Sequence, residues 1–383
     1  MNNMNKVVFL TGATGLVGGN LIPRILKNHN TTRLILLIRG NSEREAEQRV
    51  DEILGALSPE IDQSQAKRRI QVVRGDITLD RLGLSESVYT RLVSEVTHVI
   101  HSAATVQFQL PLECARLVNC IGTRNVMALA KCARQTGRLK RVAYVSTAYV
   151  SGDRVGRILE AELDCGQQFA NTYERTKFEA EEIVHQLMNE LPVTIFRPSI
   201  IVGDSKAGRT TAFNVLYPPL KLIYHGLVRI LPGSRHTPLD VVPVDFVTDV
   251  INYIFLKTNE GIGKIYHLTV GEENSTTTGE VVDLAMDYFN TTKTAEHLQR
   301  IRFMPLELYH SAKQSLRGHA KRVWQAMETY EPYLCVTRTF DNTNTRSALR
   351  GSSITPPEFK MYYPTILQYC IQTNWGRRLS CAA

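Results

Sequence analysis

The sequence lacks the cysteine spacings and the long apolar runs that mark metal-binding, disulfide-rich and membrane-spanning proteins. Its seven cysteines form no CxxC pair and show no spacing typical of metal ligands. We therefore expect reduced thiols in a cytoplasmic protein and no bound metal. No apolar run approaches the roughly 18 residues that a membrane helix needs, and the opening MNNMNK lacks the features of a signal peptide. The sequence predicts no transmembrane segment.

A block of Lys and Arg residues is also missing, although the 383-residue chain has a formal net charge of +8. Without such a block, or a basic stripe interleaved with aromatic residues, we do not expect nucleic acid as a partner. The excess of positive charge suits a phosphorylated cofactor or an acidic protein partner. The oligomeric state cannot be inferred from these features.

Short β-branched runs alternate with helical segments along the first part of the chain. The runs lie at 6–11, 33–40, 70–78, 97–104, 140–147 and 193–203. Each run is nearly continuously apolar, as expected for strands that are buried on both faces of a parallel sheet. The intervening segments EREAEQRVDEILGAL and TRNVMALAKCARQ have helical periodicity. This alternation predicts an α/β protein with a doubly wound, Rossmann-type parallel sheet.

The alternation stops after residue 204, which suggests a second region. We expect residues 1–204, completed by parts of 241–270, to bind a dinucleotide, and 205–240 with 271–383 to bind the substrate. Residues 280–330 are expected to be mostly helical and 331–383 irregular. The apolar segment 213–231, broken by Pro218-Pro219, fits a lid or channel for an apolar substrate, a peripheral lipid contact, or an ordinary core helix.

A glycine-rich turn follows the first expected strand and opens a helix. The turn has the pattern Gly-x-x-Gly-x-x-Gly, and its residues are Thr11, Gly12, Thr14, Gly15, Leu16, Val17 and Gly18. Glycines allow a tight turn whose backbone amides approach a pyrophosphate, and the helix N-terminus favours that negative charge. The position after a first strand makes this motif a specific sign of a dinucleotide site.

The second expected strand ends with Arg39, and no carboxylate follows until Glu43. Dinucleotide folds that prefer NAD place an acid near this point to bind the ribose hydroxyls. A guanidinium instead matches a 2′-phosphate in charge and geometry. We therefore expect NADPH to be the cofactor, with Arg49 on the next helix as a second contact. The alternative is that Arg39 only ends a strand in solvent.

The ends of the third and fourth strands provide further expected cofactor contacts. Asp76, next to Ile77, is placed to accept a hydrogen bond from the adenine amine, and the small residues Ala103 and Ala104 allow the backbone to pass close to the cofactor. Each could be simple turn chemistry if taken alone. Their order along the chain favours the cofactor interpretation.

Three residues form the expected catalytic group. Tyr173 and Lys177 lie four residues apart in a helical segment and therefore share one face. A nearby ammonium favours the phenolate, so we expect Lys177 to lower the pKa of Tyr173. Thr147, or Ser146 beside it, ends the fifth strand and is placed to bind a substrate carbonyl. Tyr173 would protonate the oxyanion, and Lys177 would also hold the nicotinamide ribose.

These motifs, in this order, resemble the extended short-chain dehydrogenase/reductase family. Within that family, HSAATVQF, YVSTAYVSG, YERTK and VVPVDFVTDVI look like the branch of fatty acyl-CoA reductases and thioester reductase domains. The resemblance implies NADPH-dependent reduction of acyl-CoA or acyl-carrier-protein thioesters to aldehyde or alcohol. It also implies that Pro198 and Ser199 approach the nicotinamide, and that Asn119 supports Lys177 through its backbone and a water.

Other functions on the same scaffold stay open at this point. A sugar-nucleotide epimerase or dehydratase shares the motifs, but dehydratases tend to carry acids directly after the strand-end threonine, where this chain has Ala148-Tyr149. A hydroxysteroid-type dehydrogenase would use the same three residues. A non-catalytic NADPH-binding protein is a further alternative, although such relatives usually lose the Tyr or the Lys.

Overall fold

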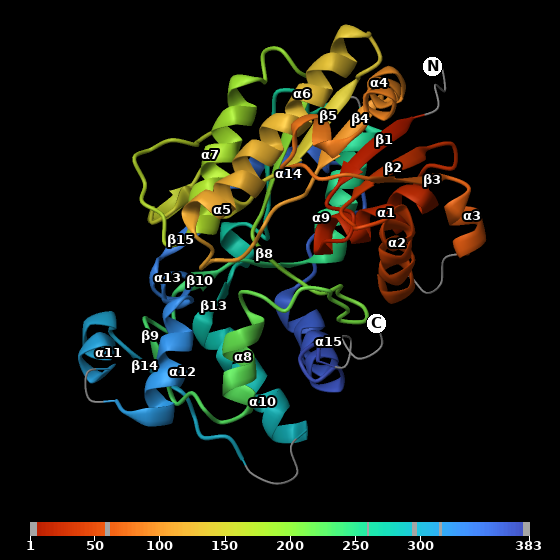
Figure 1. Ribbon diagram of the computed structural model, residues 1–383. Coiled ribbons are helices and arrows are strands. Elements are labelled where there is room, and N and C mark those ends of the chain that lie inside the picture. Colours follow the sequence, from red (N-terminus) through yellow and green to blue (C-terminus); the bar gives the residue numbers. More distant parts are fainter. Residues whose placement is uncertain (1–5, 58–61, 259, 293–296, 314–315, 378–383) are drawn as a thin grey trace.

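The computed structural model describes residues 6–57, 62–258, 260–292, 297–313 and 316–377. Within these residues, a seven-stranded sheet forms the centre of the upper part of the molecule in Figure 1. Its strands are β1 (Val7–Thr11), β2 (Arg33–Ile38), β3 (Ile70–Arg74), β4 (His98–His101), β5 (Arg141–Val145), β7 (Val193–Pro198) and β12 (Ile265–Leu268). The predicted doubly wound α/β fold is confirmed.

All neighbouring strands of this sheet are parallel, in the order β12-β7-β5-β4-β1-β2-β3. The order reverses at β1, whose last residue, Thr11, is in register with Leu37 of β2 and His101 of β4. Such a switch point leaves a crevice at the carboxyl ends of the strands, where ligands bind in open α/β sheets. The glycine-rich turn follows β1 at this crevice.

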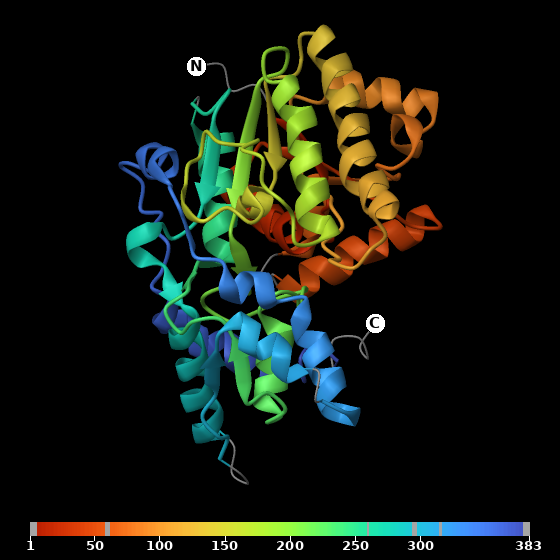
Figure 2. The same ribbon diagram turned by 90° about the vertical axis from the view of Figure 1, so that its left-hand side faces the viewer.

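Helices cover both faces of the sheet, because its strands are apolar on both sides. One face carries α1 (Leu16–Asn28), α2 (Glu43–Leu57) and α9 (Val244–Asn252), which continues into a π-helical segment, η4 (Tyr253–Lys257). The other face carries α4 (Glu86–Glu95), α6 (Gly122–Gln135) and α7 (Thr172–Gln186). Figure 2 shows α6 and α7, in yellow to green, standing in front of the sheet.

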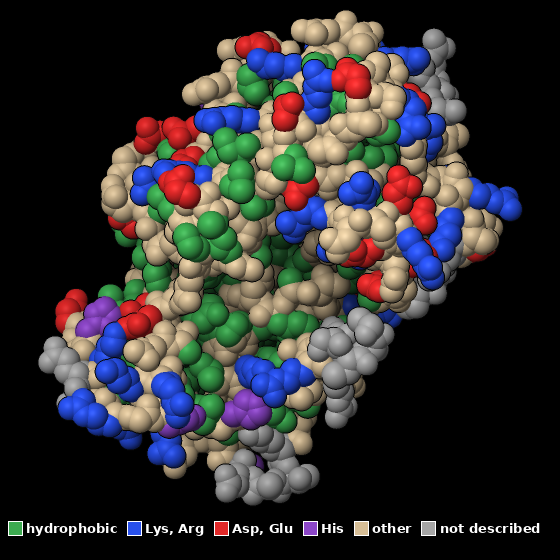
Figure 3. All heavy atoms as spheres, viewed as in Figure 1, with side chains coloured by type: hydrophobic (Ala, Val, Ile, Leu, Met, Phe, Trp, Pro, Cys, Tyr) green, Lys and Arg blue, Asp and Glu red, His purple; other side chains and the backbone are tan. Residues whose placement is uncertain are grey.

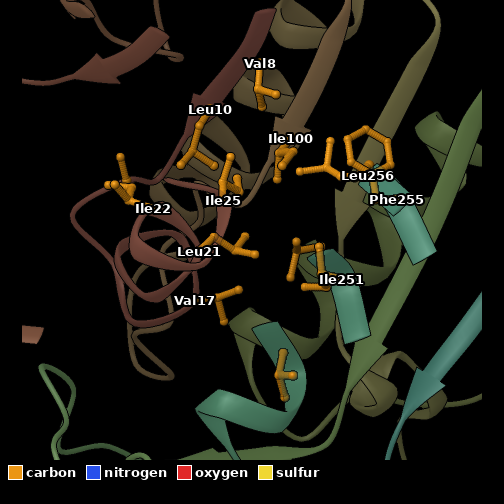
Figure 4. Packing of buried hydrophobic residues seen from close by; sticks show 14 of the residues in the cluster. Val8, Leu10, Val17, Leu21, Ile22, Ile25, Ile100, Ile251, Phe255 and Leu256 are labelled. Atoms are coloured by element: carbon orange, nitrogen blue, oxygen red, sulfur yellow. The ribbon is translucent and has the colours of Figure 1, made fainter. Parts of the chain in front are cut away.

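The contact between α1 and α9 shows how the sheet is closed on its first face. Leu21 and Ile25 of α1 meet Ile251 of α9 over Leu10 and Ile100 of the sheet, and all five side chains are fully buried (Figure 4). Burial of one such side chain contributes about 1.5–3 kcal/mol. This packing fixes the start of α1, and hence the glycine-rich turn, against the sheet.

Shorter elements connect these layers. They are α3 (Gln63–Lys67), η1 (Asp80–Gly83), α5 (Leu112–Arg116), the π-helical segment η2 (Leu117–Ile121), η3 (Ala148–Ser151) and η5 (Glu272–Asn274). Four two-stranded pairs accompany them: β8 (Ile200–Val202) with β11 (Val241–Pro243), β9 (Ile230–Pro232) with β14 (Arg302–Met304), β10 (Pro238–Leu239) with β13 (Thr276–Thr277), and β6 (Gly156–Ile158) with β15 (Arg338–Phe340).

A second apolar core lies below the sheet, among helices from the later part of the chain. These helices are α8 (Tyr217–Tyr224), α10 (Thr278–Thr292), α11 (Leu306–Lys313), α12 (Gly318–Glu328), α13 (Glu331–Cys335) and α15 (Phe359–Gln372), whereas α14 (Thr343–Ala348) packs on β12 of the sheet. Pro218-Pro219 lie in the first turn of α8. Proline is tolerated there because the amide N–H groups of a first turn have no acceptor within the helix, so the missing N–H costs no hydrogen bond. Tyr217, Leu220 and Ile223 are buried, so residues 217–224 pack as a core helix, whereas Val215 of the same apolar segment lines a cavity described below.

The expectation that 331–383 is irregular is wrong for α15. Its buried residues are Phe359, Tyr362, Tyr363, Ile366, Leu367 and Cys370, which recur at the three- and four-residue spacing of a helix face. The aromatic composition and Pro364 concealed this period in the sequence. Among the described residues, no helix is long and apolar enough to cross a membrane.

Candidate active site

A cavity of about 230 Å³ lies at the switch point of the sheet, next to the glycine-rich turn. Gly12 has a φ of +75°, and a Cβ there would lie 2.6 Å from the amide nitrogen of Ala103. A Cβ on Gly18 would lie 2.1 Å from the carbonyl oxygen of Gly12. Both positions therefore require glycine, and Gly15 is the N-cap of α1, so the amide-rich helix end faces the cavity.

The structure brings most of the expected nucleotide-binding residues to this cavity. Its lining includes Thr11, Gly12, Thr14, Gly15, Arg39, Arg49, Asp76, Ile77, Ala103 and Ala104. Gly18 packs behind the turn, whereas Leu16 and Val17 line a neighbouring cavity. The residues come from four different strand ends, as the sequence order predicted.

Two arginines stand at the edge of this cavity. Arg49 of α2 donates a hydrogen bond from Nη1 to the carbonyl oxygen of Arg39, at 2.6 Å, so the Arg49 guanidinium lies against the backbone of Arg39. Asp76 accepts a hydrogen bond from the amide of Thr78 at 2.9 Å, in a tight turn after β3. The cavity thus presents positive charge beside the end of β2 and a carboxylate after β3, the strand at the edge of the sheet.

A second cavity of about 250 Å³ adjoins the first, and Gly15, Ser102 and Ala104 line both. The expected catalytic residues Ser146, Thr147, Tyr173 and Lys177 line the second cavity, together with Pro198 and Ser199. Figure 3 shows a hollow with hydrophobic side chains between the sheet layers and the lower helices.

The start of α7 determines where Tyr173 and Lys177 point. Asn171 caps the helix, because its side chain accepts a hydrogen bond from the amide of Glu174 at 2.9 Å. Tyr173 therefore lies in the first turn and is half-buried, and Lys177 lies one turn further on and is buried. Both side chains meet the end of β5, from which Thr147 projects.

The two neighbouring hydroxyls after β5 have different partners. Thr147 is hydrogen-bonded to the Tyr173 hydroxyl, and its Oγ1 also donates to the carbonyl oxygen of Pro198 at 3.4 Å. Ser146 instead donates to the buried carboxylate of Glu181, which pairs with Arg197 at 2.8 Å (Arg197 Nε to Glu181 Oε1). Of the two, Thr147 faces the tyrosine.

The expected effect of Lys177 on Tyr173 is not what the structure shows. Burial raises the pKa of Tyr173 to about 12, and its hydrogen bond with Thr147 offsets only part of that rise. Lys177 Nζ donates to the Tyr144 hydroxyl at 2.9 Å and to the Val145 carbonyl at 2.8 Å instead. Burial lowers the pKa of Lys177 to about 8. The prediction of a lowered Tyr173 pKa is wrong because desolvation outweighs a charge that is directed elsewhere.

A chain of buried side chains extends from Lys177 towards Asn119. Tyr144 is hydrogen-bonded to Thr123, and the Thr123 hydroxyl donates to the carbonyl oxygen of Asn119 at 2.6 Å. Two side-chain hydroxyls therefore connect the lysine with the carbonyl that the family resemblance associated with it through a water. Asn119 lies in the π-helical segment 117–121, a type of bulge that is frequent at functional sites.

A branch of the same network reaches the glycine-rich turn. His101 Nε2 lies 3.0 Å from Thr123 Oγ1, and His101 Nδ1 lies 2.7 Å from Thr11 Oγ1. Burial lowers the pKa of His101 to about 3, so the imidazole is neutral and has one donor and one acceptor. Since Thr123 donates to Asn119, the protonated nitrogen is Nε2, and Thr11 donates to Nδ1.

Four aromatic side chains in the wall of the second cavity include three that the sequence reasoning did not select. Phe108 stacks on Tyr333 with ring centroids 5.6 Å apart, and Tyr149 meets Tyr333 edge-on at 5.1 Å. Phe108 also lies 5.9 Å from the ring of Tyr173. Phe108 and Tyr149 stand inside recognised motifs, but Tyr333 lies in the segment expected to be irregular, with no local signal of a role.

The sheet order, the turn after β1 and the Tyr-x-x-x-Lys helix beside it define an extended short-chain dehydrogenase/reductase. The chain belongs to the family described as male sterility protein, an NAD-binding family whose model matches residues 10–251.

Named relatives and a solved structure are similar to this chain. It is 30% identical over 279 residues to the fatty acyl-CoA reductase wat of Drosophila melanogaster, covering 64% of this chain and 53% of that protein. It is 23% identical over 443 residues to probable fatty acyl-CoA reductase 5 of Arabidopsis thaliana, covering 90% and 89%. The crystal structure of the terminal R domain from the myxalamid PKS-NRPS biosynthetic pathway superposes with a TM-score of 0.80 at 27% identity, covering 98% of this chain and 92% of that one. The chain thus spans about half the length of the Drosophila relative.

Proposed function

We propose that the protein reduces acyl thioesters with NADPH, releasing an aldehyde and a thiol. The observation that carries the proposal is the convergence of Thr147, Tyr173 and Lys177 on one cavity that joins the nucleotide cavity at Gly15. The acyl carbon gains a hydride and its oxygen takes a proton; the carbon–sulfur bond then breaks as the oxygen gives up that proton and the leaving thiolate takes one. A second hydride would convert the aldehyde to an alcohol.

The residues around the first cavity fit a dinucleotide. Gly12 and Gly18 leave space that any Cβ would fill, and the N-terminus of α1 offers amides to a pyrophosphate. Arg39 and Arg49 supply the positive charge that a 2′-phosphate needs. This arrangement supports NADPH over NADH, since the carboxylate at the turn after β2, that of Glu45, accepts a hydrogen bond from the Asn41 amide at 2.8 Å and does not line the cavity. When bound, the nucleotide supplies the hydride.

The roles of the chain's own residues follow from their pKa values and contacts. With a pKa of about 12, Tyr173 keeps its proton at neutral pH and can donate it to an oxyanion. Thr147 is placed to donate a second hydrogen bond to the same oxygen, which is the electrostatic stabilisation that acyl chemistry depends on most. The Lys177 ammonium supplies positive charge close to Tyr173 and Thr147. A thiol leaves readily, because thiol pKa values lie near 8.5.

The relatives support a thioester as the substrate. The Drosophila and Arabidopsis proteins are named as fatty acyl-CoA reductases, and the myxalamid structure is a terminal R domain of a PKS-NRPS pathway. We extend to this chain the common chemistry, with CoA or a carrier protein as the thiol. The cytoplasmic location and the assignment of 205–240 and 271–383 to the substrate stay predictions.

The rival sugar-nucleotide function is disfavoured by the cavity wall. Where dehydratases tend to carry acids, the segment after Thr147 contains Ala148 and Tyr149, both buried, and Tyr149 presents a ring to the cavity. Such a wall suits an apolar acyl group better than a sugar. A freshly purified epimerase would also carry tightly bound NAD, which the absorbance spectrum of the protein detects.

The direct test combines purified protein, NADPH and CoA thioesters of several acyl lengths. We expect loss of NADPH absorbance together with free thiol and an aldehyde or alcohol that mass spectrometry identifies. The absence of NADPH oxidation with every CoA and carrier-protein thioester, in a protein shown to bind NADPH, would contradict the proposal. Turnover of a ketosteroid or a sugar nucleotide instead would support the corresponding rival.

A further inference from the structure

The second cavity is small for a reductase of long acyl chains. Its volume is about 250 Å³, whereas sites for drug-sized ligands usually measure roughly 300–1,000 Å³. The nicotinamide ring must also enter this cavity to reach Tyr173. A benzene-sized ring fills a cavity of roughly 150 Å³, which leaves on the order of 100 Å³ for the reacting acyl group.

The position of the cavity openings limits how an acyl chain can be accommodated. Among the described lining residues, Gly15 and Val106 are the exposed ones. Gly15 belongs to the junction with the nucleotide cavity, which the cofactor would occupy. The side near Val106, 44% exposed, offers the thioester arm an entrance. An acyl group that enters there meets the aromatic wall formed by Phe108, Tyr149 and Tyr333.

Tyr333 forms the part of that wall that is held most firmly. Its hydroxyl donates to Glu174 Oε1 at 2.6 Å and accepts from Asn171 Nδ2 at 3.0 Å. Glu174 is 1% exposed, so rotation of Tyr333 away would remove a partner from a buried carboxylate, which is unfavourable. The ring is also fixed between Phe108 and Tyr149. Tyr333 is therefore a fixed barrier and not a mobile lid.

We infer that this aromatic wall, with Tyr333 as the determining residue, restricts the enzyme to thioesters of compact acyl groups, either short aliphatic chains or a single ring. The inference rests on the proposed function, and it specifies the size of the acyl group, which the relatives' names leave undefined. Phe108, Tyr149 and Tyr333 offer ring faces and edges for an aromatic acyl group, whereas a sixteen-carbon chain exceeds the space that the nicotinamide leaves in this cavity.

The test compares butyryl-CoA, benzoyl-CoA and palmitoyl-CoA with the wild-type protein and NADPH. A pocket loses roughly 10- to 200-fold in kcat/KM for a methylene that it does not fit. We therefore expect at least a hundredfold preference for butyryl- and benzoyl-CoA over palmitoyl-CoA. Tyr333→Ala should reduce that preference at least tenfold, and Tyr333→Phe, which keeps the ring, should retain it. Tyr330→Ala is the matched control, since Tyr330 starts the same helix but does not line the cavity.

Each failure has a distinct signature. If the wild type turns over palmitoyl-CoA as well as butyryl-CoA, or if folded Tyr333→Ala keeps the wild-type preference, the inference is wrong while the thioester function stands. If no thioester is reduced, the proposed function fails. In that case calorimetry tests the restriction to compact acyl groups without turnover, by comparing the binding of S-butyl-CoA and S-hexadecyl-CoA to the protein with NADP⁺. Tighter binding of the hexadecyl compound overturns the inference. Tyr333→Leu replaces the alanine variant if that variant does not fold.

Discussion

The two adjoining cavities are built from the sequence in different ways. The nucleotide cavity consists mainly of backbone turns at the ends of β1 to β4, and each turn is a short continuous motif. The substrate cavity collects side chains that are far apart in the chain, such as Phe108, Tyr149, Val215 and Tyr333. Backbone turns need particular residue types at fixed spacing, whereas a wall of side chains needs only volume and shape. The first cavity is therefore visible in the sequence, whereas the motifs reveal only the catalytic side of the second cavity and not its aromatic wall.

Tyr173→Phe should have the largest effect of the four changes. We expect it to impair catalysis in the substrate cavity and to leave nucleotide binding in the other cavity unchanged. The change removes the proton donor but keeps the ring next to Phe108, so we expect kcat to fall roughly 10²- to 10⁴-fold. The dissociation constant for NADPH, measured by fluorescence, should stay within about twofold, because Tyr173 is absent from the nucleotide cavity. Persistent turnover would show that another group donates the proton.

Arg39→Glu should act on the nucleotide cavity alone. Replacing a cation beside the expected 2′-phosphate with an anion should raise KM for NADPH roughly 100-fold and change KM for NADH little. Arg44→Glu is the matched control, because Arg44 is exposed on α2 and does not line the cavity. An unchanged preference for NADPH in the Arg39 variant would remove Arg39 from the cofactor site.

The pKa of Lys177 predicts how activity depends on pH. This pKa is lowered to about 8, so the lysine is charged below pH 8 and loses its charge as pH rises through that value. If catalysis needs the ammonium, kcat/KM should be constant below pH 8 and fall about tenfold per pH unit above it. Stopped-flow rates from pH 6 to pH 10 measure this profile, and a flat profile would exclude a role for the lysine charge.

Tyr144→Phe should have the smallest effect of the four. It removes the hydroxyl that accepts a hydrogen bond from Lys177, and we expect kcat/KM to fall about tenfold. Because the lost bond favoured the charged amine, the descending limb of the pH profile should also move below pH 8. Tyr266→Phe is the control: Tyr266 is buried in the same sheet, and no hydrogen-bond partner of its hydroxyl occurs among the described residues. If the pH above which kcat/KM falls is the same in the variant and the wild type, Tyr144 has only a packing role.

Sequence reasoning was most successful where local chemistry decides the structure. Gly12 and Gly18 need their residue type for steric reasons, and the strands are recognisable because they are apolar on both faces. It failed for the pKa of Tyr173, since spacing along a helix shows that two side chains share a face but not where the ammonium points. It also missed Tyr333, whose role depends on contacts with Phe108 and Glu174, more than 150 residues earlier in the chain.

The location of Tyr333 has a consequence for related chains. The family model covers residues 10–251, and Tyr333 lies on α13, well beyond that segment. The family model thus omits the residue that we infer to determine the acyl group, although Phe108 and Tyr149 of the same wall lie within it. Two members can therefore share the stretch that handles the nucleotide and still accept different thioesters, if the short helix after residue 330 carries a different side chain.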